Sequence, residues 1–283
     1  MKFTDYTKAP GINASLIGAW LTDPLDARDM LAGARKDSPA LATGRLLHSL
    51  VFEPRWAESH YVIQPETYTN DKGEEKPWNN NATACREWNA EQDGAQVVTQ
   101  AVMDSFREQA KVIRAHPHVK PLVSLKGGHR EHSIFATCPK YGPLKCRFDY
   151  IDPVAGIAVD LKTMRDVTDA GMAKAIAQYH YWVKAAFYIY VAKLAGIGIK
   201  EFWFIGARLT DPIRINVKQL DPLDIAAGTD EFNRVLPLLQ AAQLTGEWPD
   251  PSGGKITMPE WAWSAFNASL GDDLIFDGQE ITL

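Results

Sequence analysis

The spacing of apolar and polar positions divides the chain into a helical first part and a later part that combines strands with long helices. The first 60 or so residues have the pattern of short helices, and either Asn13 or Ser15 is suited to cap the first of them. Asp23-Pro24 predicts the start of a second helix, with proline in its first turn. A third helix is expected over residues 39–52.

The next part of the chain combines a short strand, a polar loop and further helix. A brief strand is expected at residues 61–63. Residues 65–82 are polar and rich in turn-forming side chains, which indicates a mobile surface loop. Helical spacing resumes at about Thr83 and continues to about His116, with a break near residue 93.

The period then changes to the alternating or continuous apolar pattern that predicts β-strands. The expected strands are residues 130–137, 144–151, 157–163, 200–209 and 212–219. Between the third and fourth strands, apolar residues recur every three or four positions, which predicts one long helix from about Asp169 to Ala195. A last helix is expected over residues 222–244, and the Trp261/Trp263 pair lies in the tail that follows.

These elements predict a central mixed β-sheet flanked by helices, in one α/β or α+β domain over residues 1–283. Residues 1–125 would form its mainly helical part, residues 126–245 its sheet-and-helix core, and residues 246–283 a tail. The chain has 283 residues, of which 46% are hydrophobic and 23% are charged, as is typical of a soluble globular protein.

Composition and charge argue against several classes of protein. No run reaches the roughly 18 apolar residues of a membrane helix, and the first residues lack the apolar core of a signal peptide, so no membrane is expected. The three cysteines show no CxxC spacing, which argues against a disulfide framework or a cysteine-rich metal site and favours a reducing cytoplasm. The net charge of −5 argues against a generally basic nucleic-acid binder but permits a local basic channel.

An acid and a base stand two residues apart in AVDLKT, a segment that otherwise has the pattern of a buried strand. Because strand side chains alternate between faces, Asp160 and Lys162 project to one side, and Val159 and Leu161 project to the other. Charged residues are the ones least often fully buried. The pair therefore points to a charged partner or to a function.

The segment just upstream, KCRFDYI, brings a second acid to the same place. Arg147 and Asp149 share one face of this strand, and Phe148 and Tyr150 share the other. The turn-forming residues DPVAG follow it, so the two segments are expected to form an antiparallel hairpin. Such a hairpin brings Asp149 opposite Asp160, or within a residue or two of it.

Two carboxylates that close together repel each other unless a proton or a cation lies between them. Oxygen ligands suit hard divalent ions such as Mg²⁺ or Mn²⁺, and the Lys162 ammonium could orient or deprotonate an attacking water. A surface salt bridge between Lys162 and either Asp149 or Asp160 explains the same residues equally well.

Two upstream residues could join this cluster. Glu131, in REHSIF on the preceding strand, could add a third carboxylate, although alone it is more typical of a solvated glutamate. His48, in GRLLHSL, could be a metal ligand, and Gly44 one turn earlier leaves room for a close backbone approach. A lone histidine on an apolar helix face is, however, more often a hydrogen-bonded core residue.

The predicted long helix carries a stripe that its apolar face does not require. Steps of about 100° per residue place Tyr181, Lys184 and Tyr188 together, away from Val183. Packing against another helix explains this stripe at least as well as a functional role does. The functional alternative is contact with the phosphates or bases of a nucleic acid beside the metal site.

In their order along the chain, GRLLHSL, REHSIF, CRFDYID, AVDLKT and YHYWVKAAFY resemble the PD-(D/E)XK nuclease superfamily. The resemblance is closest to the RecE-type exodeoxyribonuclease VIII enzymes of phages and prophages, and it covers roughly residues 10–245. A DxK pair alone is a weak signal, whereas five motifs in order on strands and helices are specific. The resemblance implies a restriction-endonuclease-like core with a helical N-terminal part.

The resemblance also implies roles for individual residues. It places ligands of Mg²⁺, for which Mn²⁺ can substitute, at four positions: His48, Asp149, Asp160 and the main-chain carbonyl of Leu161. Lys162 falls on the catalytic lysine. Glu131 matches the family's upstream acid, which can bind a second metal ion or a water.

Members of the family degrade double-stranded DNA from 5′ ends and leave 3′ single strands for an annealing protein. They form rings that are threaded by the duplex. The partners that the resemblance implies are therefore double-stranded DNA ends, further copies of this chain in a ring, expected to be a tetramer, and a single-strand annealing protein.

One position departs from the family pattern. The family has a glutamine in a QxxxY motif on the long helix, and Lys184 stands at that position here, followed by Tyr188. Gln178 fits the register less well, because Trp182 lies four residues after it. A lysine could hold a phosphate as a point charge.

Two alternatives to this exonuclease stay open, and the changed glutamine position supports the first of them. One is a non-catalytic DNA-end-binding or assembly subunit built on a nuclease fold. The other is a related nuclease with a different polarity or a single-stranded substrate.

Overall fold

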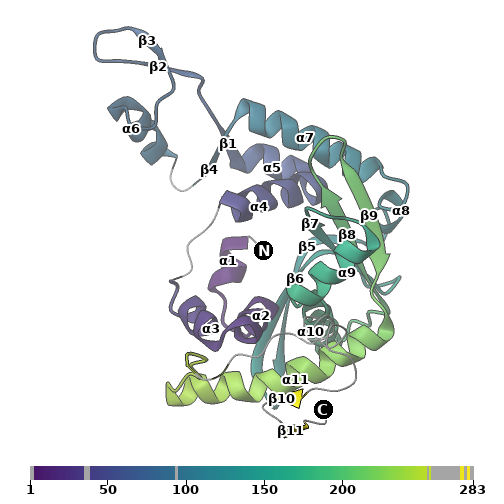
Figure 1. Cartoon of the computed structure of the whole chain (residues 1–283). Coiled ribbons are helices and arrows are strands. Elements are labelled where there is room, and N and C mark those ends of the chain that lie inside the picture. Colours follow the sequence, from purple (N-terminus) through teal and green to yellow (C-terminus); the bar gives the residue numbers. More distant parts are fainter. Residues whose placement is uncertain are drawn as a thin grey trace. The chain divides into compact units, whose positions relative to one another are not determined.

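A five-stranded mixed sheet forms the centre of the first of two units into which the chain divides, residues 1–249 and 250–283 (Figure 1). The structure, a computed structural model, describes residues 3–34, 39–92, 95–253, 255, 275–276 and 279–280. In the second unit it describes a short antiparallel ribbon of β10 (Ile275–Phe276) and β11 (Gln279–Glu280). The Trp261/Trp263 pair lies outside the described residues, and the single domain over residues 1–283 stays a prediction.

The strands of the central sheet follow each other in space in the order of the sequence. They are β5 (His129–Cys138), β6 (Gly142–Asp152), β7 (Ile157–Thr163), β8 (Glu201–Arg208) and β9 (Arg214–Gln219). Only the pair β7–β8 is parallel, and the other neighbours are antiparallel. The mixed sheet and its five predicted strands are therefore confirmed.

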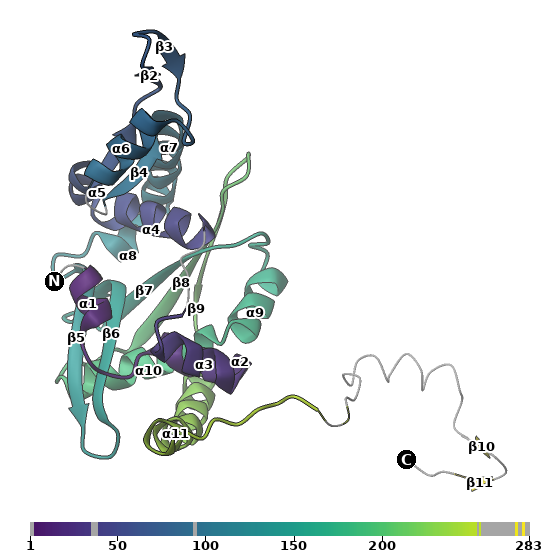
Figure 2. The same ribbon diagram turned by 90° about the vertical axis from the view of Figure 1, so that its left-hand side faces the viewer.

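Helices cover both faces of this sheet (Figure 2). One face packs against α2 (Ala14–Thr22), α3 (Pro24–Leu31), α10 (Tyr181–Leu194) and α11 (Pro222–Thr245). The other packs against α4 (Pro39–Phe52), α5 (Pro54–His60), α7 (Gln100–Ala115) and α8 (Lys120–Val123). The remaining helices are α1 (Phe3–Lys8), α6 (Thr83–Glu91) and α9 (Asp169–Gln178). No helix in the described part of the chain has both the length and the apolar character needed to cross a membrane.

The first helices begin where their capping residues predict. The Asn13 side chain, rather than Ser15, accepts the Leu16 N–H at 2.9 Å and caps α2. Asp23 caps α3 in the same way through the N–H of Leu25, at 2.8 Å. These caps lead the chain from α2 directly into α3.

Two segments differ from their predicted structure because each pairs with a distant or returning part of the chain. Within the predicted loop over residues 65–82, β2 (Thr67–Thr69) and β3 (Glu75–Pro77) form an antiparallel hairpin that projects from the unit (Figures 1 and 2). Within the span predicted to be helical, β4 (Gln96–Thr99) is a strand that pairs in parallel with β1 (Tyr61–Gln64). The predicted break near residue 93 lies outside the described residues.

The predicted long helix over residues 169–195 is two helices. It is interrupted between α9 and α10, where His180 adopts the left-handed conformation with φ 54°. Neither glycine nor proline marks this break, so the local pattern does not reveal it. Tyr179, an aromatic residue at the end of α9, is 57% exposed at this interruption.

Candidate active site

The acidic cluster forms where β6 and β7 separate. The two strands pair from Asp152 and Ile157 as far as Tyr150 and Val159, and the same register carries Asp149 opposite Asp160, as predicted. Beyond the last pair, the carboxylate of Asp149 accepts the N–H of Leu161 at 2.7 Å. The Asp149 side chain thus replaces a backbone hydrogen bond between the two strands, and its carboxylate lies in the gap between them.

The neighbouring strand is irregular at the same level. Glu131 has φ +46°, a left-handed conformation that is uncommon for a residue with a side chain, and the regular pairs of β5 and β6 lie on either side of it. Strained backbone of this kind concentrates at functional sites.

The irregularity reaches the core packing of β6. Phe148 packs against Tyr188 of α10, whereas Tyr150 lies in the core beneath α4 and α7. The prediction that these two rings share one face is therefore wrong, because the side-chain alternation breaks at Asp149.

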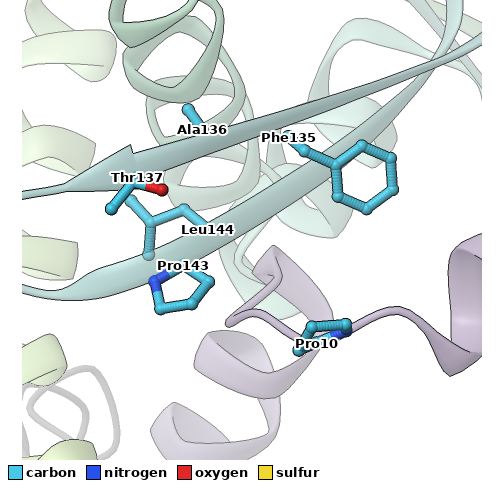
Figure 3. Close-up of a pocket in the computed structure, with 6 residues that line it drawn as sticks. All are labelled: Pro10, Phe135, Ala136, Thr137, Pro143 and Leu144. Atoms are coloured by element: carbon cyan, nitrogen blue, oxygen red, sulfur yellow. The ribbon is translucent and has the colours of Figure 1, made fainter.

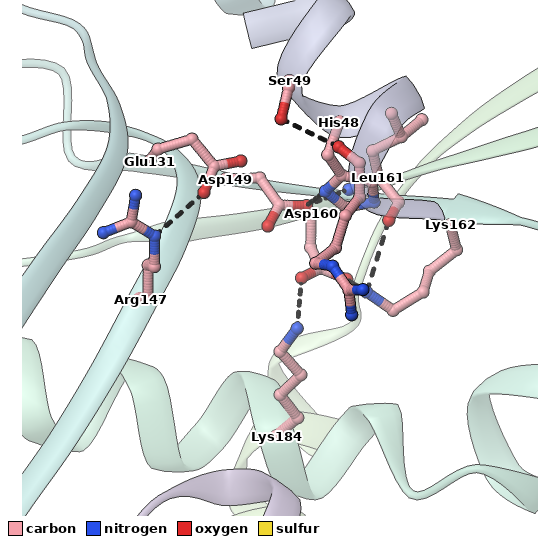
Figure 4. Close-up of polar contacts among 10 residues, drawn as sticks. His48, Ser49, Glu131, Arg147, Asp149, Asp160, Leu161, Lys162 and Lys184 are labelled. Atoms are coloured by element: carbon pink, nitrogen blue, oxygen red, sulfur yellow. Dashed lines mark hydrogen bonds and ion pairs between the residues drawn. The ribbon is translucent and has the colours of Figure 1, made fainter. Parts of the chain in front are cut away.

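Helix α4 brings His48 over the end of these strands. Its Nδ1 lies 3.2 Å from Oδ2 of Asp149, and potential ligand atoms of His48, Glu131 and Asp149 all lie within 4.8 Å of one another (Figure 4). Two carboxylates and an imidazole at this spacing suit a divalent metal ion. A Cβ on Gly44 would meet no described atom within 4 Å, so the expected close backbone approach there is not found.

The two carboxylate oxygens of Asp160 contact two different lysines (Figure 4). Oδ2 pairs with Lys162, whose ammonium is also 3.3 Å from the carbonyl oxygen of Leu161. Oδ1 pairs with Lys184 of α10 at 2.5 Å. The salt-bridge alternative is thus realised for Asp160, but Asp160 is only 1% exposed, so this is not a surface pair.

The position of Lys162 supports the fit of a metal ion to the site. Its ammonium lies between Oδ2 of Asp160 and the Leu161 carbonyl, two oxygens that the resemblance assigns as metal ligands. A protein cation is thus held between these two oxygens, which shows that they can bind positive charge.

Arg147 also belongs to the cluster, although its pattern in the sequence predicts only that it shares a face with Asp149. Its Nε lies 3.0 Å from Oε2 of Glu131, and another of its nitrogens donates to Oγ of Ser133 at 2.7 Å. Arg147 therefore fixes the Glu131 carboxylate beside the strained backbone. The alternation in CRFD was the available signal, because it put a cation two residues from a candidate ligand.

Burial and nearby charges together shift the pKa values of His48, Asp149 and Glu131. Burial disfavours the imidazolium of His48, but Asp149 outweighs it and raises the pKa of His48 above its ordinary value. Burial would also raise the pKa of Asp149, yet His48, and then Lys162, lower it. For Glu131, burial and then the charge of Asp149 raise the pKa to about 7. Asp149 is thus the stable anion of the cluster.

The two lysines differ in the same respect. Burial lowers the pKa of Lys162, and Asp160 offsets this only in part. Burial also acts on Lys184, but Asp160 outweighs it and raises the pKa of Lys184 well above its ordinary value. Lys162 is therefore the lysine that gives up a proton more readily.

The predicted nucleic-acid stripe turns inward. Lys184 contacts Asp160 rather than the surface. The ring of Tyr181 lies 5.0 Å from Nζ of Lys162 and stacks on Phe204. Tyr188 is 8% exposed and its ring packs against Phe148, while its contact with DNA stays a prediction. The packing alternative holds for Tyr188.

A separate hollow of about 260 Å³ lies between β5, β6 and the segment before α2 (Figure 3). Its lining residues are Pro10, Phe135, Ala136, Thr137, Pro143 and Leu144. None of these side chains ionises near neutral pH, so we assign no chemistry to the hollow.

The comparisons with known proteins agree with this architecture. The "Putative exonuclease" from Eubacterium rectale has a crystal structure that superposes with a TM-score of 0.61 at 15% sequence identity, over 94% of this chain and 98% of that one. The likeness shows a shared fold. A second solved structure, SSO0001, reaches a TM-score of only 0.29 at 15% identity, over 49% of this chain and 69% of that one, and supports no argument. No curated protein is significantly similar to the sequence.

The family comparison covers most of the chain. Residues 14–258 match the model of a family described as a PDDEXK-like domain of unknown function (DUF3799). The match includes α4, β5, β6, β7 and α10, which carry all the residues of the acidic cluster. The chain therefore belongs to this PDDEXK-like family and has its nuclease-like fold.

Proposed function

We propose that this protein is a divalent-metal-dependent exodeoxyribonuclease that degrades linear double-stranded DNA in the 5′→3′ direction. The 3′ single-stranded tails that it leaves would serve homologous recombination by strand annealing. The observation that carries the proposal is the buried cluster of Asp149, Asp160 and Lys162 at the separated ends of β6 and β7, with His48 and Glu131 beside it.

Different residues of the cluster would bind the metal ion and activate the water. His48, Asp149, Asp160 and the Leu161 carbonyl would hold the metal ion. What a bound Mg²⁺ or Mn²⁺ supplies there is polarisation of the scissile phosphate and a lower pKa for a water. When the metal ion binds, Lys162 would move away from Asp160 and the Leu161 carbonyl. Its amino group would then orient the attacking water or, in its neutral form, accept a proton from it.

The partners follow from the same proposal. Double-stranded DNA ends are the substrate, further copies of this chain would form a ring, a tetramer by resemblance, and an annealing protein would receive the single strands. The net charge of −5 is compatible with DNA binding if basic side chains line the channel and acidic ones face outward.

The test is digestion of a blunt linear duplex labelled at its 5′ ends in one sample and at its 3′ ends in another, with and without Mg²⁺. We expect rapid release of the 5′ label, slow loss of the 3′ label, and no release without the metal. Lys162→Ala and Asp160→Ala should each reduce the rate by about 10²-fold or more. Lys193→Ala, an exposed lysine of α10, is the control and should leave the rate unchanged.

Two other results would contradict the proposed site or the proposed polarity. Undiminished activity in the Lys162→Ala and Asp160→Ala variants would contradict the site, and faster release of the 3′ label would contradict the polarity.

A second candidate is a DNA-end-binding or assembly subunit without catalysis. One observation favours it. Both carboxylate oxygens of Asp160 form ion pairs with lysines, Lys162 and Lys184, and these ammonium groups compete with a metal ion. The same duplexes distinguish the two functions, because a binding subunit would retard them in a gel without releasing nucleotides.

A further inference from the structure

Lys184 holds a different part of the site from Lys162. Lys162 lies where the Asp160 carboxylate and the Leu161 carbonyl come together, so its ammonium competes directly with a metal ion for those oxygens. Lys184 reaches Asp160 from another element, α10, and contacts the other carboxylate oxygen, Oδ1, at 2.5 Å. A metal ion could therefore displace Lys162 while Lys184 stays in place.

The surroundings of Lys184 fix its ammonium where it is. Its Nζ lies 5.0 Å from the centre of the buried Tyr188 ring, one turn later on α10. The helix itself cannot shift readily, because it packs closely on α11: a Cβ on Gly228 would lie 2.7 Å from the carbonyl oxygen of Trp182 and 2.9 Å from Cβ of Ala186. Lys184 thus reaches Asp160 from a closely packed helix.

The balance of charge leaves little room for a second divalent ion. The cluster contains the carboxylates of Asp149, Asp160 and Glu131, and the cations Lys162, Lys184 and Arg147 are paired with it. Among these six groups, the formal charges balance before any metal binds. One divalent ion adds two positive charges, which a DNA phosphate can offset in part, and a second ion would add two more in a poorly solvated place.

Two of the oxygens that a second ion could use are also engaged. Oδ1 of Asp160 is taken by Lys184, and Oε2 of Glu131 lies 3.0 Å from Arg147. Glu131 is the acid that the resemblance connects with a second metal ion or a water. The pairing with Arg147 favours the water.

We propose that Lys184 is a positioning residue that supplies a fixed positive charge at Oδ1 of Asp160 in place of a second metal ion, so that each site binds one divalent ion. This inference deepens the proposed function and rests on it. Asp160 then binds the ion through Oδ2 alone, and the lysine keeps the carboxylate in that orientation.

The test counts bound metal ions rather than turnover. Purified full-length protein is titrated with Mn²⁺ in the absence of DNA, and free Mn²⁺ is measured by electron paramagnetic resonance. We expect one Mn²⁺ per chain in the wild type and two in Lys184→Gln, because the amide frees Oδ1 from a charged partner. Lys193→Gln, on an exposed lysine of the same helix, is the matched control and should bind one.

A second variant keeps the test decisive. Lys184→Met has a similar length without the charge, and it replaces Lys184→Gln if thermal unfolding shows that the glutamine variant does not fold. Two ions in the wild type, or one ion in a folded variant without the charge, would overturn the inference. If the wild type degrades duplex DNA and the ion count does not change, only the inference fails. If the wild type neither binds Mn²⁺ nor releases nucleotides, the proposed function fails.

Discussion

At the scale of single residues, Asp160 is a buried acid held between two lysines. It is 1% exposed and its two oxygens face two ammonium groups. Removing one partner of a buried ion pair typically costs about 3–5 kcal/mol, because the remaining charge is left without compensation. In the metal-free protein, neutralising Asp160 would leave Lys162 and Lys184 to repel each other.

The stability of the metal-free protein should reveal this coupling. We expect Asp160→Asn to lower the free energy of unfolding by about 3 kcal/mol, as measured by urea denaturation in the presence of a chelator. In the double variant with Lys184→Met, the loss should be smaller than the sum of the two single losses by about 1–3 kcal/mol. The reason is that removing the lysine also removes the uncompensated charge.

Lys193→Met provides the control for this cycle, because Lys193 is exposed on the same helix. Its combination with Asp160→Asn should be additive. Additivity of the Lys184 pair, within about 0.5 kcal/mol, would show that Lys184 does not interact with Asp160.

At the scale of elements, the site depends on irregularities rather than on regular strands and helices. Three irregularities each interrupt a regular element: the left-handed Glu131, the separation of β6 and β7 beyond the Tyr150–Val159 pair, and the left-handed His180 before α10. The first two direct carboxylates into one place. The third begins the helix that carries Lys184 to Asp160.

The close packing of α10 on α11 can be tested at Gly228, the glycine where the two helices cross. Gly228→Ala places a methyl group against the carbonyl oxygen of Trp182 and should lower the free energy of unfolding by about 1–3 kcal/mol. Gly18→Ala, in α2, is the matched helical control, because its Cβ would meet nothing within 4 Å. It should raise stability by up to about 1 kcal/mol.

Urea denaturation of both variants measures the difference. A stabilising Gly228→Ala would mean that the two helices have space to separate and that α10 is not firmly seated.

At the scale of the whole molecule, the site brings together parts of the chain that are far apart in the sequence. His48 comes from the helical layer on one face of the sheet, Lys184 comes from the layer on the other, and the strands between them supply the acids. Neither the N-terminal helices nor the sheet alone contains a complete site.

The proposed ring leads to a prediction about the assembled protein. Light scattering of the purified protein should give a mass of about four chains, and degradation should continue on one duplex when unlabelled competitor DNA is added after the start. The physical reason is that a closed ring around the DNA must dissociate or reach an end before it can change substrate. A monomer that releases its substrate after each cut would contradict the ring while leaving the catalytic site intact.

The sequence by itself determined the main elements and pointed to most members of the acidic cluster as candidates. The five strands of the sheet follow from alternating or continuous apolar patterns. The position of Asp149 opposite Asp160 follows from a hairpin with a recognisable turn. These features are local, because side-chain alternation and turn residues act over only a few positions. The identities of His48 and Lys162 as candidates came from the same short motifs.

Only the tertiary structure decided how the charges are paired. That Lys184 holds Asp160, that Arg147 holds Glu131 and that Tyr188 lies in the core depend on where distant elements pack. The strand at Gln96–Thr99 exists because it finds a partner some 35 residues earlier in the chain. Local patterns carry no record of such partners, because the free energy that selects them is gained only when the whole fold forms.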